Sequence, residues 1–363
     1  MSSPDLAGQL RHFGECVRGE IPALLRHYQA KTATGAVCYL DQPGKPRRIR
    51  PWCDALEIGA AFRILPGSMD RKAWINALRG FQDPVTGLVP EYLPDDRHLE
   101  SSGTLPPHQV APYNTMIVNY ALECFGSSLA HPVFASEQIN AGLLEEILAT
   151  LDWANGAWGA GHWIDCYASC LSANQRHFGQ GHRIDDLFRW LDAHVDLKSG
   201  LWGQWRQEDR WLQPVNGFYR LTRGTYAQFG RPLPLPEKAI DTILLHSTDP
   251  AFFAEGRGNA CNVLDVVHPL WLCLRQTDHR RDEAEAWVRA RLPQALTRWH
   301  PSRGLAFDPA AANDQGQPGL QGTEMTLSII YLMADLLGLT EHLSWIPRGV
   351  HRLPPATTAE SCF

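Results

Sequence analysis

Acidic, amide and imidazole side chains recur near the expected starts of several helices in this chain. In the stretch from Arg257 to Gln276, Asn262, Asp265 and His268 follow one another at spacings of three before the sequence turns apolar. On a helix these side chains share one face near the N-terminal end. An ionised side chain is costly to bury unless it is paired or used, so the pattern favours acid–base chemistry at a cavity. A structural hydrogen bond or cap formed by Asp265 and His268 is the alternative.

Similar polar helix starts are found elsewhere in the chain, and the same reasoning applies to them. The residues expected to be catalytic carry a carboxyl or imidazole group and are Asp265, His268, Asp165, Asp54 and Glu324. A capping carboxylate is the alternative for Asp54, and a bond to a neighbouring helix is the alternative for Asp165. A capping box or a buried hydrogen bond is the alternative for Glu324. Glu57 is a further candidate acid.

The side chains expected to bind substrate are polar, aromatic or cationic. They are His162, Tyr113, Asn114, Asn216, Tyr219, Arg220, Asn262 and Gln321. Arg220, with Arg223 nearby, is suited to hold a carboxylate or phosphate through two hydrogen bonds, with packing as the alternative. Trp residues such as Trp158 stack on sugar rings and on carbocations alike, and core packing is the alternative. The segment 91–109 is long for a loop and is expected to be a lid.

The elements that must position these side chains repeat along the chain. Each unit is expected to contain a helix, a turn and a second helix that begins with a polar residue. These polar residues are Asp54, Asn114, Asp165, Asn216, Asp265 and Glu324, and they recur every 49–60 residues. Such a period is typical of stacked helical hairpins, and six hairpins that close in a ring bury every apolar stripe. An open solenoid is the alternative. Helices expected at 1–30 and 51–65 form the first unit, with Gly19 and Pro22 kinking or splitting the former.

The repeated turns QDPVTGL, DLKSGLWG and PSRGLAF each precede a helix with a small or polar head. In this respect the chain resembles the (α/α) toroids from about residue 15 to 340. These include six-hairpin glycosidases, related lyases and epimerases, terpenoid cyclases and protein-prenyltransferase barrels. The resemblance implies an all-α, (α/α)6 toroid of six helical hairpins as a single domain over 1–350, followed by a flexible tail at 351–363. The DxDD and DDxxD motifs of terpenoid enzymes and the Cys-His-Gly zinc motif of lanthionine cyclases do not occur, so the resemblance leaves the chemistry open.

The composition narrows the class of protein. The net charge of −6 argues against a general nucleic-acid binder, and no membrane span is expected. An odd number of nine cysteines, with no signal peptide and no CxxC pair, favours a cytoplasmic protein with reduced thiols. Cys166 and Cys170 lie one helical turn apart, but without a second pair they are expected to pack rather than bind metal. Neither a metal nor another cofactor is predicted.

Three functions are compatible with these residues. A carbohydrate-active enzyme, acting as a hydrolase, lyase or epimerase on a small-molecule or oligosaccharide substrate, would use two carboxyl groups as acid and base. Asp265 and either Asp54 or Asp165 are the expected pair, with His268 tuning the first. A terpenoid cyclase or prenyl-processing enzyme would instead protonate its substrate from one Asp in an aromatic cavity. A non-catalytic binding scaffold is the third possibility. The composition of the cavity wall is expected to discriminate between the first two.

Overall fold

The structure, a computed structural model, is mainly helical, which agrees with the predicted all-α class. It describes residues 5–32, 35–90, 110–254, 257–351 and 363. The helices are α1 (Leu6–Tyr28), α2 (Arg50–Phe62), α3 (Arg71–Arg79), α4 (Val110–Glu123), α5 (Phe134–Glu137), α6 (Ala141–Thr150), α7 (Ala157–Phe178), α8 (Ile184–His194), α9 (Leu212–Thr222), α10 (Pro236–Ser247), α11 (Pro250–Phe253), α12 (Ala260–Cys273), α13 (Arg281–Leu296) and α14 (Leu320–Leu336). A π-helical turn, Arg223–Ala227, directly continues α9.

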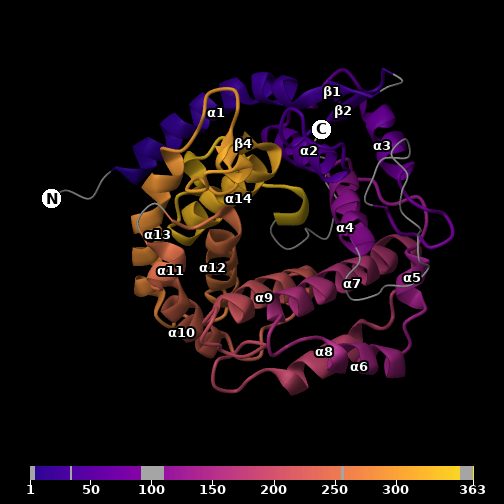
Figure 1. Cartoon of the computed structure of the whole chain (residues 1–363), viewed down its shortest axis with the longest axis vertical. Helices are drawn as coiled ribbons and strands as arrows, with labels where there is room; N and C mark the ends of the chain where they lie inside the picture. Colours follow the sequence, from indigo (N-terminus) through magenta and orange to yellow (C-terminus); the bar gives the residue numbers. More distant parts are fainter. Residues whose placement is uncertain (1–4, 33–34, 91–109, 255–256, 352–362) are drawn as a thin grey trace.

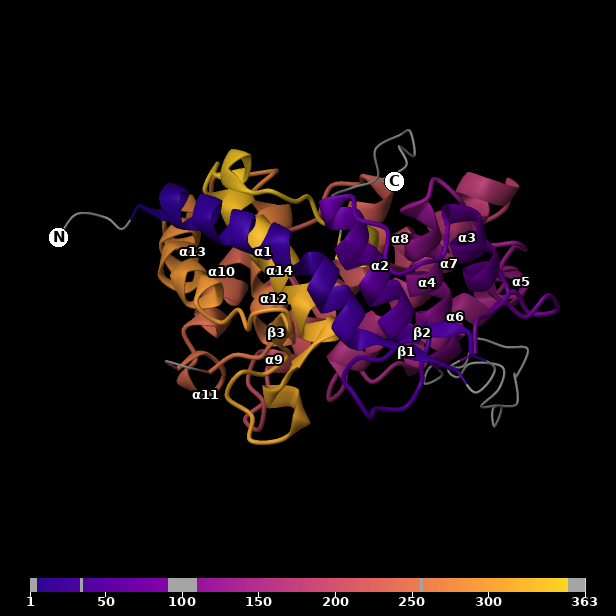
Figure 2. The same cartoon turned by 90° about the horizontal axis from the view of Figure 1, so that it is seen from above.

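Two short antiparallel sheets accompany the helices. Strand β1 (Gln29–Lys31) pairs with β2 (Val37–Tyr39), and β3 (Leu305–Ala306) pairs with β4 (Pro318–Gly319). In Figure 2 the strands β1, β2 and β3 lie in the lower half of the molecule, and the C-terminus lies at the top. In the described part of the chain, no helix is both long enough and apolar enough to cross a membrane.

The helices fall into an inner and an outer set. In Figure 1, α2, α4, α7, α9, α12 and α14 surround the centre, whereas α1, α3, α6, α8, α10 and α13 lie further out. Each inner helix contacts the next one along the chain, and α14 contacts α2. The inner helices are those that carry the polar residues repeated in the sequence, so the arrangement brings these residues toward a shared interior.

The turns that lead into the inner helices depend on acidic side chains and on glycine. The Oδ1 atom of Asp83 accepts the backbone N–H of Val85 at 2.7 Å, and Oδ1 of Asp196 accepts that of Ser199, also at 2.7 Å. Gly87 and Gly200 close the two turns with φ angles of 74° and 71°, a region that favours glycine. The repeated turn motif therefore reflects the same local geometry in both units.

Glycine also sets the distance between α7 and α9. A Cβ atom added at Gly161 would overlap the backbone of Gly217, and one added at Gly217 would overlap the backbone of Ala157. The two helices therefore pack backbone against backbone along this stretch. This close approach places the side chains of α7 directly against those that follow on α9 and its π-helical turn.

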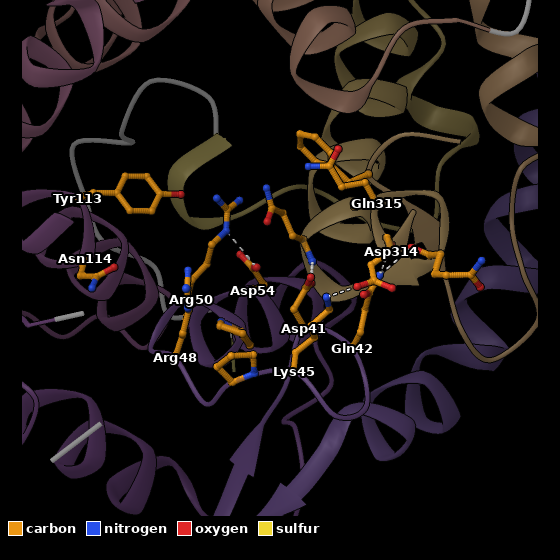
Figure 3. A pocket seen from close by; sticks show the side chains of 17 residues that line it. Asp41, Gln42, Lys45, Arg48, Arg50, Asp54, Tyr113, Asn114, Asp314 and Gln315 are labelled. Carbon is orange, nitrogen blue, oxygen red and sulfur yellow. Dashed lines mark hydrogen bonds and ion pairs between the residues drawn. The ribbon is translucent and has the colours of Figure 1, made fainter. Parts of the chain in front are cut away.

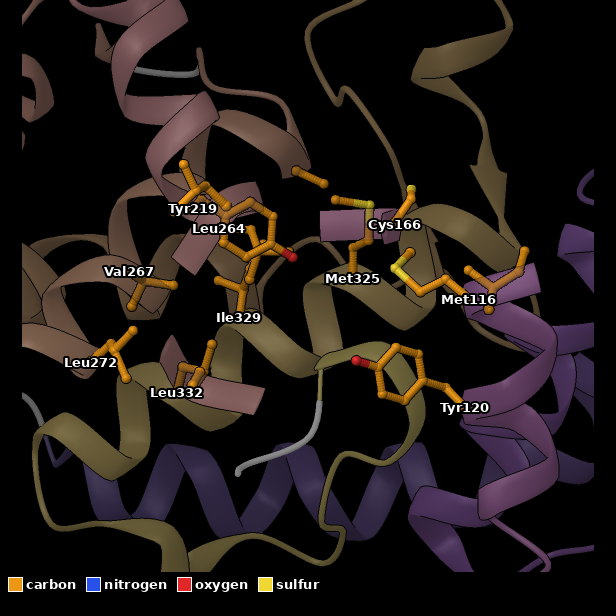
Figure 4. Packing of buried hydrophobic residues seen from close by; sticks show 14 of the residues in the cluster. Met116, Tyr120, Cys166, Tyr219, Leu264, Val267, Leu272, Met325, Ile329 and Leu332 are labelled. Atoms are coloured by element: carbon orange, nitrogen blue, oxygen red, sulfur yellow. The ribbon is translucent and has the colours of Figure 1, made fainter. Parts of the chain in front are cut away.

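Apolar packing joins α12 to α14. Leu264 and Val267 of α12 are fully buried. Ile329 and Leu332 of α14 expose at most 2% of their surface. Figure 4 shows these side chains in one packed region, where the apolar part of α12 faces α14. The apolar residues of α12 and α14 thus pack in the core and hold the polar starts of these two helices in position.

Hydrogen bonds connect a segment near the start of the chain, after β2, with the start of α14. The backbone N–H of Leu320 donates to the carbonyl oxygen of Asp41 at 3.1 Å, and that of Gln321 donates to Oδ1 of Asp41 at 2.8 Å. Lys45 forms an ion pair with Asp314. These bonds connect the segment after β2 to the start of α14, and they fix the relative position of α2 and α14.

Three expectations about individual segments can be compared with the structure. Helix α1 runs unbroken through Pro22, so the predicted split does not occur. The predicted tail began at residue 351, but His351 is buried in a 3₁₀ turn, Gly349–His351, that contacts α4. Glycine at position 349 allows this turn to lie directly against Glu57. Its φ angle is 68°, and a Cβ atom added there would overlap the Glu57 side chain. The remaining tail at 352–362 and the predicted lid at 91–109 lie outside the described residues.

We predict that Gly161→Ala lowers the free energy of unfolding by about 1–3 kcal/mol, because the added methyl group must separate α7 from α9. Gly159→Ala is the matched control, since a Cβ atom there meets no atom within 4 Å and alanine favours the helix by up to about 1 kcal/mol. Urea unfolding of both variants measures the difference. Equal stabilities would show that the close approach is not a constraint.

Candidate active site

Two cavities open among the inner helices. The first, which we name the Asp265 cavity, has a volume of about 510 Å³ and is lined by Arg50, Tyr113, Trp158, Gly159, His162, Gln213, Tyr219, Arg220, Arg223, Cys261, Asp265, Gln321, Met325 and His351. The second, the Asp54 cavity, has a volume of about 520 Å³ and is shown in Figure 3. Its polar lining includes Asp41, Gln42, Arg48, Asp54, Asn114, Gln315 and Gln317. Arg50, Tyr113 and Gln321 line both cavities, so the two spaces adjoin.

Asp265 lines the first cavity as a buried carboxyl group without a hydrogen-bond partner. Only 1% of its surface is exposed, and neither carboxyl oxygen has a hydrogen-bond partner among the described residues. The helix cap expected of this region is supplied instead by Asn259, which accepts the backbone N–H of Asn262 at 2.9 Å. Burial raises the pKa of Asp265 well above its usual range, against the opposing charges of Arg220 and Arg223. The raised pKa favours the protonated form of Asp265, which is the form that can donate a proton.

His268 does not join Asp265 in the cavity wall. Its ring lies between Tyr219 and Trp271, with ring centroids 5.2 and 5.6 Å away, and its Nδ1 atom has no hydrogen-bond partner among the described residues. Burial lowers the pKa of His268 to about 3, so the imidazole is neutral. Positions three apart differ by about 60° around a helix, which is enough for one side chain to face the cavity and the other its neighbours.

Asp165 forms a buried ion pair and does not line either cavity. Its Oδ2 atom lies 2.9 Å from Nη2 of Arg220 and also contacts Nη2 of Arg223, while Oδ1 accepts from Nε of Arg223 at 3.3 Å. Gly224 allows this contact, because a Cβ atom there would overlap Asp165. The bond to a neighbouring helix, the alternative to a catalytic role, is thus the arrangement observed. Asp165 fixes two arginines that do reach the cavity.

The cation of Arg220 also determines the state of His162. Nη2 of Arg220 donates to Nδ1 of His162 at 2.5 Å. A guanidinium group can only donate, so Nδ1 carries no proton and the hydrogen of the neutral imidazole is on Nε2. Burial, aided by the charges of Arg220 and Arg223, lowers the pKa of His162 well below its usual range. His162 therefore lines the cavity as a neutral group whose ring is tilted by 35° against that of Tyr113, with ring centroids 5.4 Å apart.

Asp54 is the acidic group of the second cavity whose protonation changes near neutral pH. It is 5% exposed, and its Oδ2 atom accepts from Nε of Arg50 at 3.3 Å (Figure 3). Burial raises the pKa of Asp54 to about 7, with Arg50 lowering it and the negative charges of Glu324 and Asp41 raising it further. A carboxyl group with such a pKa can accept a proton or donate one at neutral pH.

Glu324 lies behind His351 rather than in the cavity wall. Nδ1 of His351 lies 2.7 Å from Oε1 of Glu324, and Oγ of Ser328 donates to the same oxygen at 3.3 Å. The other oxygen, Oε2, has no hydrogen-bond partner among the described residues. Burial lowers the pKa of His351, and Glu324 opposes this effect. The predicted buried hydrogen bond of Glu324 is therefore observed, with a histidine from the C-terminal segment as its partner.

Tyr113 lies where the two cavities meet and is in contact with two cations. The guanidinium carbons of Arg50 and Arg220 lie over its ring, 5.6 and 5.4 Å from the centroid. Tyr219 contacts Arg223 in a similar way, with the guanidinium carbon 5.2 Å from its ring centroid, and its hydroxyl oxygen also accepts from Nη1 of Arg223 at 3.1 Å. Aromatic rings thus separate and orient the arginines of the cavity wall.

The predicted amides divide between the cavities and the core. Gln321 lines both cavities, and Asn114 lines the Asp54 cavity while its Nδ2 atom donates to the carbonyl oxygen of Pro90 at 2.9 Å. Asn216 is fully buried and lines neither cavity, and neither of its side-chain polar atoms has a hydrogen-bond partner among the described residues. Asn262 also lines neither cavity. A polar position near a helix start is therefore not sufficient to place a side chain in the wall.

Several wall residues were not among the predicted site residues, and Arg50, Gln213 and His351 are polar examples from the Asp265 cavity. Arg50 had a local signal, because it precedes Asp54 by one helical turn. Gln213, whose Oε1 atom accepts the backbone N–H of Trp158 at 3.2 Å, lies in the first turn of α9. His351 had no signal, since its position depends on how the C-terminal segment docks. Within the described residues, no group of three or more His, Cys, Asp or Glu side chains is arranged to hold a metal ion.

We predict opposite effects of two Asp→Asn substitutions on stability at pH 7. Asp165→Asn should cost about 3–5 kcal/mol of unfolding free energy, because it leaves Arg220 and Arg223 buried without their acidic partner. Asp265→Asn should preserve or raise stability, because burial disfavours the charged form of the native carboxyl and asparagine carries no charge. Urea unfolding of the two variants makes the comparison. Similar losses for both would contradict the distinction between a paired and an unpaired carboxyl group.

We predict that Asp54→Asn becomes more stable relative to the native protein as the pH rises from about 4 to about 7. The carboxyl has a pKa of 3.8 when unperturbed and about 7 when folded. Between these values the folded chain retains a proton that the unfolded chain has lost, so native stability falls with rising pH. Asparagine cannot ionise and removes this loss. Chemical unfolding at several pH values tests it; a stability difference independent of pH between 4 and 7 would contradict the raised pKa.

The site was also compared with known proteins. No protein-family model, no curated protein and no solved structure matches this chain. The arguments for its function therefore come from the geometry of the two cavities.

Proposed function

We propose that this chain is a carbohydrate-active enzyme, a hydrolase, lyase or epimerase, in which Asp265 acts as general acid and Asp54 as general base. The observation that carries the proposal is the unpartnered, buried carboxyl of Asp265 in a cavity wall rich in amide, guanidinium and phenol groups. Such a wall suits a ligand with many hydroxyl groups. The substrate would be a small sugar or an oligosaccharide.

The two carboxyl groups are suited to different parts of a proton-transfer reaction. The raised pKa of Asp265 favours the protonated form, which can donate to a leaving oxygen, whereas Asp54, with a pKa of about 7, can accept a proton near neutral pH. Two acids whose environments give them different pKa values are the usual basis of acid and base roles in one site. Asp165, the alternative to Asp54 as the second carboxyl group, is assigned instead to positioning Arg220 and Arg223.

The same proposal includes the architecture and the compartment. The contacts of α2, α4, α7, α9, α12 and α14 in chain order, and of α14 with α2, support a closed (α/α)6 toroid in which these helices form the inner ring. A toroid would place the polar starts of the inner helices around one space. The described cysteines are all free, which supports a cytoplasmic location.

A terpenoid-type cyclase is the second candidate. The observation in its favour is an apolar region that borders the Asp265 cavity: Met325 lines the cavity, and Met116 and Cys166 from two other helices lie in the same interior region as Met325 (Figure 4). A single protonated Asp beside such a region would suit a carbocation cascade. Arg50, Arg220 and Arg223 in the wall argue against it, because guanidinium groups disfavour a nearby carbocation.

We predict that a panel of glycosides, free sugars and prenyl diphosphates will reveal turnover of a sugar substrate, measured by product chromatography. Asp265→Asn and Asp54→Asn should each lower kcat/KM by about 10²–10⁴, the usual contribution of a general acid or base. Asp278→Asn, whose side chain is 89% exposed, is the control and should retain native activity. Native turnover in both cavity variants would reject the assignment. Turnover of prenyl diphosphates alone would favour the cyclase, and no turnover of any substrate by the native protein would favour a binding scaffold.

A further inference from the structure

We infer that the ligand of the Asp265 cavity is an anionic sugar, and that Arg50 and Arg220, both packed on the ring of Tyr113, bind its carboxylate, sulfate or phosphate group. The inference builds on the proposed function for the sugar part of the ligand. The anionic part rests on the charges and free donors of the cavity wall.

The cavity wall itself carries an excess of positive charge. Arg50, Arg220 and Arg223 line it, and Asp265 is its one carboxyl group in the described part of the chain. Asp165 and Glu324 lie behind the wall, bonded to arginines and to His351 respectively. Asp54 contacts a single nitrogen of Arg50 from the neighbouring cavity. Arg220 and Arg223 share the single carboxylate of Asp165, so this pair alone leaves one positive charge unbalanced beside the cavity.

Two of the arginines have donors that remain to be satisfied. Among the described residues, Nε of Arg220 is buried without an acceptor, although its Nη2 atom binds both Asp165 and His162. Arg50 donates to Asp54 through Nε, and the two terminal nitrogens of Arg50 have no acceptor among the described residues. Figure 3 shows the Arg50 guanidinium directed into the open space beside the Tyr113 hydroxyl group. Unused guanidinium donors at a cavity are the groups that bind oxyanions through paired hydrogen bonds.

The arginines are held in place before a ligand arrives. Asp165 anchors Arg220, which is 11% exposed, and the ring of Tyr113 supports both Arg220 and Arg50. Fixing a flexible cationic side chain in advance reduces the entropy that is lost when a ligand binds. This order distinguishes the pair from surface arginines, whose positions are set by solvent.

Isothermal titration calorimetry with sugars that differ only in charge tests the inference. The probes are glucose, glucuronate, the methyl ester of glucuronate, glucose 6-sulfate and glucose 6-phosphate. We expect at least one of the anionic sugars to bind at least about tenfold more tightly than glucose. If that sugar is glucuronate, it should also bind at least about tenfold more tightly than its neutral methyl ester. A tenfold difference is in keeping with one charge-assisted hydrogen bond. The anion preferred among the three identifies the group that the site takes. Equal affinities for all five sugars would overturn the inference.

Variants then locate the site. Arg50→Gln changes a side chain that is 24% exposed, and it leaves Asp165 with both of its arginines. This variant should lower the preference for the anion by at least about tenfold. Arg50→Lys keeps the charge and should retain part of the preference. Arg220→Gln should have the same effect as Arg50→Gln, with circular dichroism to verify its fold. Arg189→Gln, a surface arginine 75% exposed, is the control and should bind as the native protein does. An unchanged preference in Arg50→Gln and in folded Arg220→Gln would also overturn the inference.

Binding and turnover fail independently in this design. An anionic preference without turnover of any sugar would refute the proposed enzyme and leave the anion site standing. Turnover of neutral glycosides by a protein that binds anionic and neutral sugars equally would refute the anion site and leave the enzyme standing.

Discussion

The ion pair of Asp165 with Arg220 and Arg223 is the interaction on which the rest of the site depends. It lies where α7 meets α9, and it forms only because Gly161, Gly217 and Gly224 let the two backbones approach closely. Two cations are thereby held inside a helical protein with an acidic partner behind them. Without this partner their burial would be strongly unfavourable. The positive wall of the cavity, the tautomer of His162 and the field around Asp265 all follow from it.

Three aspartates at comparable positions on inner helices illustrate how the surroundings decide chemical behaviour. Asp165 is paired with two arginines, Asp54 contacts one arginine through a single nitrogen, and Asp265 has no hydrogen-bond partner among the described residues. Burial is common to all three, so the difference lies in the partners. A paired carboxylate is structural, whereas carboxyl groups with few partners retain the freedom to exchange a proton.

The cavities are built from segments that are distant in the chain. Arg50 comes from α2, Tyr113 from α4, Arg220 from α9, Asp265 from α12 and His351 from the C-terminal segment. Each segment has its own apolar contacts with the core, so the polar groups are positioned by packing that does not involve them. This separation of roles allows a polar wall, costly by itself, to exist inside a large apolar core.

The sequence by itself determined the helical class, the repeat of about 50–60 residues and the turns closed by Gly87 and Gly200, because periodicity and turn chemistry act over a few neighbouring residues. It also identified most of the acidic and cationic side chains that reach the interior. Only the tertiary structure decided that Asp165 is neutralised by arginines of another helix, that His268 faces aromatic rings, and that His351 bonds to Glu324 instead of belonging to a free tail. These outcomes depend on contacts between residues tens of positions apart in the chain and on the burial that those contacts create. Neither the partner of a charge nor its loss of solvent is encoded in local spacing.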